Sequence, residues 1–308
     1  MNKKRILPIG FYDLNAIEAR KNYEYTKIAI ENYLSRGYEL IKTSIAEFVD
    51  NYDDKDTSNV FKIIDPISKK NIFFRNDITL QIAKYISSRS NLDFEVPLKL
   101  CYYGDIINLN SDELYCERQQ TQVGCEIIGD NSLNSCYEVI SDTLNILSNI
   151  NNVSININLP DFLDIFLQQI NLPSSDLLRN AIINKRISDI NMLAGQYRLI
   201  IAELVINNSD FNSVSHNLKK LFDGKIVAQL NQAHELMEFL HKNFPNVKIN
   251  FDLFGDDKFS YHNSIAFDVF SSNFPYPIAK GGCYSIAGVD KILNSVGSTI
   301  YINFLRKI

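Results

Sequence analysis

Residues 73–85 read FFRNDITLQIAKY, and residues 97–129 read PLKLCYYGDIINLNSDELYCERQQTQVGCEIIG. These segments decide the fold, because short polar side chains recur within otherwise apolar sequence. Asp77 can pair with an ammonium group, and Thr79 lies on the same face of an extended run. Gln122 and Glu126 can accept amide or imidazole N–H groups. The residues alone leave two interpretations open, a site for a small zwitterion or the polar face of a strand.

The order of these motifs resembles the histidyl-tRNA synthetase family. The shared motifs are R-x-D-x-T at residues 75–79, Y-Y-G at 102–104 and R-Q-Q-T-Q-x-G-x-E-x-I-G at 118–129. Flanking matches extend the likeness from about residue 5 to the end of the chain: the P-x-G-x-x-D opening at 8–13, the dimer-forming first class II motif at 37–48, and GGCYS at 281–285, which is similar to G-G-R-Y-D. The resemblance implies an α+β fold of the class II synthetase type, with an antiparallel sheet flanked by helices and a helical insertion.

The chain departs from the family at the arginines that hold ATP. The position that clamps the α-phosphate falls on Asn108, and further family arginines fall on Ser111, Cys116, Asp257 and Cys283. Arg118 survives, whereas the final arginine of the third motif falls on Phe304, two residues before Arg306. A guanidinium makes paired charge-assisted bonds to phosphate that asparagine, serine and cysteine cannot replace. We therefore expect no useful adenylation.

The amino-acid side of the site is retained. The resemblance implies a histidine-binding set in which an acidic residue holds the α-ammonium group and a carboxylate with a tyrosine pair faces the imidazole. The positions that match this set are Asp77, Thr79, Gln122, Glu126, Tyr261 and His262.

Together these features favour a non-catalytic regulatory subunit of short-form ATP phosphoribosyltransferase, which serves the first step of histidine biosynthesis. The resemblance implies a complex with the catalytic subunit, a homodimer within that complex, and histidine as feedback effector. Two alternatives are a truncated histidyl-tRNA synthetase and a synthetase paralogue that binds tRNA.

Composition limits the partners. The formal net charge is −5, without the long basic tract that a nucleic-acid ligand favours. The five cysteines form no C-x-x-C pair, and we find neither a signal peptide nor an apolar run of about 18 residues. We therefore expect reduced thiols in the cytoplasm, with no metal, cofactor, nucleic acid or membrane as partner.

Periodicity predicts the layout. Residues 1–159 and 245–308 are expected to form the core and residues 160–244 a helical insertion, with no anticodon-binding domain, because the third motif ends at Ile308. Helices are predicted at 14–36, 78–87 and 135–150, a hairpin at 60–65 and 71–75, strands at 38–48, 98–107, 121–128, 153–159, 249–254, 265–270 and 278–281, and a terminal helix that begins between 296 and 302.

Overall fold

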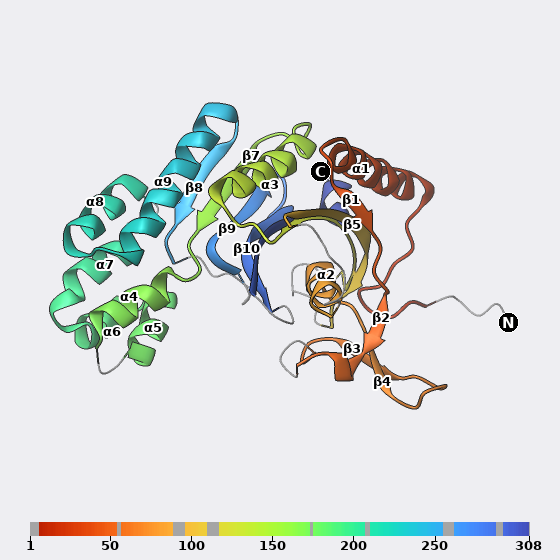
Figure 1. The fold of residues 1–308 in the computed structure, drawn as a ribbon, viewed down its shortest axis with the longest axis horizontal. Helices are drawn as coiled ribbons and strands as arrows, with labels where there is room; N and C mark the ends of the chain where they lie inside the picture. Colours follow the sequence, from red (N-terminus) through yellow and green to blue (C-terminus); the bar gives the residue numbers. More distant parts are fainter. Residues whose placement is uncertain are drawn as a thin grey trace.

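The computed structural model of this chain describes residues 6–53, 57–88, 96–109, 117–172, 175–206, 210–254, 262–287 and 292–307. At its centre is an eight-stranded sheet in the order β1-β5-β6-β11-β10-β9-β7-β8 (Figure 1). Its strands are β1 (Glu39–Ile41), β5 (Leu98–Ile107), β6 (Gln119–Ile128), β7 (Val153–Asn158), β8 (Lys248–Asp252), β9 (His262–Ser271), β10 (Ala279–Ala287) and β11 (Ile292–Tyr301). All pairs from β5 to β7 are antiparallel, whereas the edge pairs β1–β5 and β7–β8 are parallel. The expected α+β fold is confirmed, with a mixed rather than wholly antiparallel sheet.

Helices cover the two faces of this sheet differently. Three helices lie against one face: α1 (Ala16–Ser35), α3 (Leu133–Ile146) and α10 (Ile302–Leu305). Helix α2 (Ile78–Ser87) contacts β5 and β10 on the opposite face. Side chains alternate along β6, so Cys125 points towards α3 while Glu126 meets Thr79 of α2. The sheet therefore separates an apolar helix-packed side from a polar side beneath α2.

Helix α1 begins and ends as its sequence indicates. Asn15 caps its N-terminus in a reciprocal capping box with Glu18. Gly37, just past the C-cap Arg36, adopts φ +84°, which favours glycine. This helix boundary is confirmed.

The predicted strand at 38–48 is wrong as a single element. Its ends form β1 and β2 (Ala46–Phe48), and β2 belongs to a separate sheet with β4 (Asn71–Phe74) and β3 (Phe61–Ile64). The break has a long-range cause: Arg75 Nη1 donates to the Thr43 carbonyl oxygen at 3.2 Å, and Gln81 Nε2 donates to the Ser44 carbonyl oxygen at 2.8 Å. These carbonyl groups thus bond to side chains at the turn between the two sheets.

The C-terminal end of the chain also differs from expectation. Residues 292–301 form β11, where no strand was predicted, whereas the terminal helix α10 begins at Ile302, within the predicted range of 296–302. Three polar residues of β11 are buried: Ser295, Ser298 and Thr299. Each of their hydroxyl groups forms a hydrogen bond with another residue of the protein, which allows polar side chains in the core. The strand therefore lacks the alternation of apolar and polar residues from which strands are predicted.

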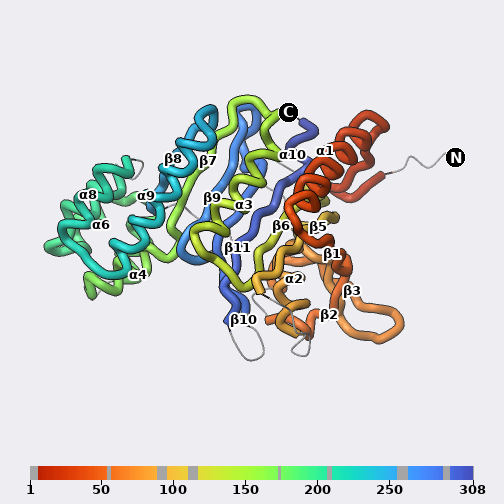
Figure 2. The backbone as a smooth tube through the Cα atoms, turned by 45° about the horizontal axis from the view of Figure 1, so that its top comes forward, coloured from red at the N-terminus to blue at the C-terminus, as the bar shows by residue number. Residues whose placement is uncertain are grey.

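Helices fill the sequence between β7 and β8. They are α4 (Phe162–Ile170), α5 (Ser175–Ile183), α6 (Ile187–Leu193), α7 (Arg198–Ile206), α8 (Phe211–Leu221) and α9 (Lys225–Asn243). Figures 1 and 2 show α4, α6 and α8 on the side of the molecule opposite α1 and the small sheet. The division at residues 160 and 244 into core and insertion stays a prediction. Within the described ranges, no helix combines the length and apolar character needed to cross a membrane.

Candidate functional site

Glu126 is the centre of a hydrogen-bonded cluster on the α2 side of the sheet. Thr79 Oγ1 donates to Glu126 Oε1 at 2.7 Å, and the Tyr284 hydroxyl donates to Glu126 Oε2 at 2.6 Å. The Tyr102 hydroxyl lies 3.1 Å from Thr79 Oγ1 and 2.7 Å from Thr299 Oγ1. Helix α2 and strands β5, β6, β10 and β11 thus each supply one member of the cluster.

A glycine opposite Glu126 makes room for its side chain. Gly297 of β11 is its register partner, and a Cβ atom at that position would overlap the carboxylate. The glutamate side chain therefore folds over the neighbouring strand, where Tyr284 can reach it. Only a residue without a side chain permits this arrangement.

Burial controls the protonation of Glu126. The carboxyl group is fully buried, and desolvation raises its pKa to about 8, although the hydrogen bonds from Tyr284 and Thr79 oppose the shift. Asp77 adds to the increase by charge repulsion. No ion pair found among the described residues includes Glu126. At neutral pH the group is mostly protonated, and it can exchange a proton with a basic ligand.

The structure brings only some of the predicted site residues together. Thr79 and Glu126 are in direct contact, and Asp77 lies at the start of the same helix as Thr79. Asp77 Oδ1 also caps α2 by accepting from the Leu80 amide at 2.9 Å. Its carboxylate therefore has a structural role in addition to the predicted ammonium contact.

Gln122 lies two pleats along β6 on the face shared with Glu126. Its side chain is buried, and its Oε1 atom has no hydrogen-bond partner among the described residues. A buried amide oxygen in this state is an acceptor for an incoming N–H group. Tyr261, with Ser111, Cys116 and Asp257, lies outside the described residues, and for His262 only the backbone pairing with Tyr284 is described.

Sequence reasoning missed Tyr284 and Tyr102. Both stood in quoted motifs: Tyr284 is the tyrosine of GGCYS, and Tyr102 is the first of the Y-Y-G cluster. Neither motif shows that these hydroxyl groups meet at Glu126 and Thr79. The adjacent Cys283 points towards α3 instead, where its Sγ atom lies 3.3 Å from Cys136 Sγ, so position 283 does not face this cluster.

Arg118, the surviving family arginine, and Arg306 both have structural partners. Arg118 stacks over the Phe61 ring at 4.1 Å, and its Nε donates to the Asn108 carbonyl oxygen at 3.2 Å. Arg306 is 7% exposed, and its Nη2 lies 3.1 and 3.2 Å from the two Glu117 carboxylate oxygens.

Arg306 also lies on the wrong side of the sheet for the site. Its carbonyl oxygen accepts from Lys21 of α1 at 3.3 Å, and its guanidinium stacks over the Tyr12 ring at 4.7 Å. The register shift that would let Arg306 replace the third-motif arginine is therefore not supported.

A cation on the polar side of the sheet is likewise paired. Lys280 of β10 is the register partner of Thr299, and its Nζ lies 2.9 Å from Asp268 Oδ1. The arrangement around Glu126 thus offers carboxyl, hydroxyl and amide groups suited to a small polar molecule rather than a triphosphate. Within the described ranges, no three His, Cys, Asp or Glu side chains are grouped to hold a metal ion.

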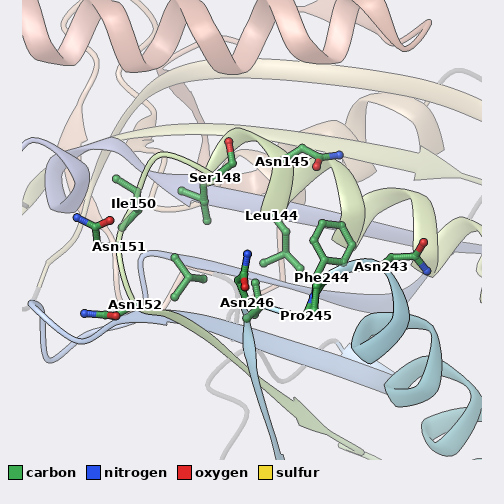
Figure 3. Close-up of a pocket in the computed structure, with 13 residues that line it drawn as sticks. Leu144, Asn145, Ser148, Ile150, Asn151, Asn152, Asn243, Phe244, Pro245 and Asn246 are labelled. Carbon is green, nitrogen blue, oxygen red and sulfur yellow. The ribbon is translucent and has the colours of Figure 1, made fainter.

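Two of the cavities among the described residues are the largest of those found away from this cluster. One of about 430 Å³ lies between the end of α3, the turn before β7 and the segment after α9 (Figure 3). Five asparagines and no charged residue line it, so it contains no acid–base group. The other, of about 750 Å³, lies between residues 41–52 and the C-terminal half of α2.

Comparison with known proteins agrees with the fold. Curated relatives include two proteins named ATP phosphoribosyltransferase regulatory subunit. The one from Paramagnetospirillum magneticum is 23% identical over 97% of this chain and 80% of that protein. The one from Pseudomonas fluorescens is 27% identical over 92% of this chain and 75% of that protein. A Bacillus halodurans structure described as an ATP phosphoribosyltransferase regulatory subunit/histidyl-tRNA synthetase superposes with a TM-score of 0.82 at 19% identity, covering 100% of this chain and 83% of that one. A chain of the ATP phosphoribosyl transferase (HisG:HisZ) complex from Thermotoga maritima superposes with a TM-score of 0.71 at 17% identity. The superposition covers 94% of this chain and 98% of that one.

The family profile described as Histidyl-tRNA synthetase matches residues 10–305. That match spans the cluster around Glu126, the sheet that carries it and the helices between β7 and β8. The chain therefore belongs to the histidyl-tRNA synthetase family.

Proposed function

We propose that this chain is the regulatory subunit of a short-form ATP phosphoribosyltransferase and works in complex with a separate catalytic subunit. The observation that carries the proposal is the contrast within one sheet: the Glu126 cluster is assembled, while Arg118 and Arg306 are held by Phe61 and Glu117. Relatives that carry this name match most of the chain, which supports the same assignment. The chain then binds an amino acid without activating it.

Histidine is the proposed effector. Glu126 exchanges a proton with the imidazole, Asp77 pairs with the α-ammonium group, and the buried Gln122 Oε1 accepts an N–H group. Thr79 fixes the Glu126 carboxyl group, and Tyr261 and His262 complete the set by family resemblance. Histidine inhibits the complex if it binds the inactive arrangement better than the active one. The equilibrium between the two arrangements then shifts by no more than the ratio of the two affinities.

A homodimer within the complex is the second part of the proposal. The first class II motif lies in the α1–β1 region, where Leu40 is 48% exposed and Ile28 and Leu34 of α1 also lie open to solvent. A two-fold interface would bury these side chains against their own copies. We further propose that the helices between residues 160 and 244 form an insertion in the core, and that the complex works in the cytoplasm.

Co-expression with the catalytic subunit tests the assignment. We expect the catalytic subunit to be inactive alone, active with this chain, and inhibited by histidine. Asp77→Asn keeps a cap for α2, because asparagine caps helices as well as aspartate does, but it removes the charge that pairs with the ammonium group. It should weaken histidine inhibition about 10- to 100-fold while the complex still assembles.

The regulatory assignment and the histidine site can each be contradicted separately. A catalytic subunit that is fully active alone, or that does not co-purify with this chain, contradicts the regulatory assignment. Unchanged inhibition in both Asp77→Asn and Glu126→Gln contradicts histidine binding at this site and leaves the assignment itself standing.

A further inference from the structure

Two buried cysteines from distant parts of the chain face each other on the helix side of the sheet. Cys136 of α3 and Cys283 of β10 are 147 residues apart in sequence, and their Sγ atoms are 3.3 Å apart. Cys136 is 2% exposed and Cys283 is 1% exposed. Neither residue contributes to the cluster around Glu126.

The geometry is close to that of a covalent link. A disulfide has sulfur atoms about 2.0 Å apart, so the two sulfurs must approach by about 1.3 Å. Strand β10 has a register irregularity against β9 between Gly282 and Cys283, where the backbone departs from regular pairing. Such a bulge gives the Cys283 backbone room for a small displacement.

The contact also distinguishes the two thiols chemically. The hydrogen bond between the two thiols, with Cys136 as donor, lowers the pKa of Cys283 and raises that of Cys136. No hydrogen bond between Cys101 and another thiol is found among the described residues, and burial raises the pKa of Cys101 to about 11. Since the thiolate is the reactive form, Cys283 is favoured as the attacking sulfur.

We propose that Cys136 and Cys283 form a site of reversible oxidative cross-linking, at which hydrogen peroxide converts the two thiols into one disulfide between α3 and β10. The Cys283 thiolate attacks one peroxide oxygen, the O–O bond breaks, and hydroxide leaves with the electron pair, which gives a sulfenic acid. Cys136 sulfur then attacks the Cys283 sulfur, and the S–O bond breaks. The hydroxyl group leaves as water with the Cys136 proton, so two thiols are oxidised and one peroxide is reduced to two waters.

A disulfide at this position can affect the cluster around Glu126 on the polar side of the sheet. Tyr284 follows Cys283 directly and points to the other face, where it donates to Glu126. A displacement of β10 towards α3 at position 283 therefore shifts the Tyr284 backbone. This inference rests on the geometry and acidity of the two thiols and does not require the proposed regulatory function.

The test uses the full chain, fully reduced and then exposed to hydrogen peroxide. The sequence has five cysteines, so denaturing alkylation should find five thiols before oxidation and three after the loss of two, with one cross-linked peptide pair containing residues 136 and 283. Dithiothreitol should restore all five thiols. Closing a loop of this length should raise the melting temperature by roughly 5 °C.

Matched variants separate the pair from the other thiols. Cys136→Ser and Cys283→Ser each leave four thiols, and neither should form the cross-link or gain melting temperature on oxidation. Cys101→Ser, at a buried position with no thiol hydrogen bond in the described part of the chain, should cross-link as the natural chain does. A different cysteine pair in the peptide map, or sulfinic acid at Cys283 with Cys136 still free, would overturn the proposal.

Discussion

Gly297 and Glu126 are register partners on neighbouring strands, and the Glu126 carboxyl group occupies the space in which a side chain at position 297 would begin. The glycine therefore determines where the buried acid can lie. Tyr284 and Thr79 reach the carboxyl oxygens only in that position.

Gly297→Ala should displace Glu126 and weaken histidine binding at least about 10-fold, with a loss of stability of about 1–3 kcal/mol from overpacking. Titration calorimetry and urea unfolding measure the two effects. Gly224→Ala is the control, since no described residue other than its chain neighbours lies within 4 Å of the added methyl group, and its φ of +60° makes the substitution strained. It should cost stability and leave binding unchanged, whereas equal binding in both variants would contradict the role of Gly297.

Histidine affinity should follow a bell-shaped pH profile. The pKa of Glu126 is about 8, and that of a histidine imidazole is about 6.5. Between these values the free site and free ligand together carry the one proton that the bound pair shares. Affinity should fall below about pH 6.5, where a proton must be released, and above about pH 8, where one must be taken up. An affinity that keeps rising down to about pH 5 would contradict a raised Glu126 pKa.

Glu126→Gln should change the pH dependence of stability. The folded chain keeps the Glu126 proton up to about pH 8, whereas the unfolded chain loses it near 4.5. Unfolding releases a proton between these values, so the free energy of unfolding falls as the pH rises through that window and is level above it. Glutamine does not titrate, so the variant should gain about 4 kcal/mol relative to the natural chain between pH 5 and pH 9, at about 1.4 kcal/mol for each pH unit up to pH 8. Urea unfolding across this range measures it, and Glu31→Gln on exposed α1 should show no gain.

The chain should catalyse no histidine-dependent exchange between pyrophosphate and ATP. Asn108 replaces the α-phosphate arginine, while Arg118 and Arg306 are held by structural partners. Asn108→Arg alone should not create activity, because one guanidinium is insufficient to clamp the phosphates. Exchange comparable with that of an authentic histidyl-tRNA synthetase assayed in parallel would refute the assignment as a regulatory subunit.

Leu40→Glu should convert a dimer into a monomer. The substitution places a charge at an exposed apolar position of β1, where a two-fold interface would remove it from water. Sedimentation velocity at micromolar concentration distinguishes the two states. Met192→Glu, at a 76% exposed position on α6, should leave the dimer intact, and a natural chain that is already monomeric would contradict the proposal.

Local pattern was sufficient for several elements and insufficient for others. The helix at 78–87 and the strand at 98–107 match their predicted bounds, because each has an apolar period bounded by a clear cap or turn. Strand β11 was missed because Ser295, Ser298 and Thr299 are buried by pairing with groups far away in sequence. The strand predicted at 38–48 is interrupted after β1 because Arg75 bonds to the Thr43 carbonyl oxygen. The local propensity of residues 38–48 contains no information about this distant contact.

The candidate site shows the same limit. Family resemblance selected Thr79 and Glu126, which lie in contact although 47 residues separate them. Tyr284 was missed because its contact with Glu126 depends on two features of the assembled sheet. One is the space left by the missing side chain at Gly297, and the other is the face of β10 on which Tyr284 lies. Motif order thus identified polar residues, while the hydrogen-bond partners required the assembled sheet.

The place of β11 between β6 and β10 has a consequence for synthesis of the chain on the ribosome. Strands β5 and β6 are made long before residues 292–301, so one edge of β6 stays unpaired while about 160 further residues are added. Unpaired strand edges recruit other chains. Slow translation of the sequence after β6 should therefore increase aggregation of nascent chains, and chaperone capture should be strongest before β11 emerges.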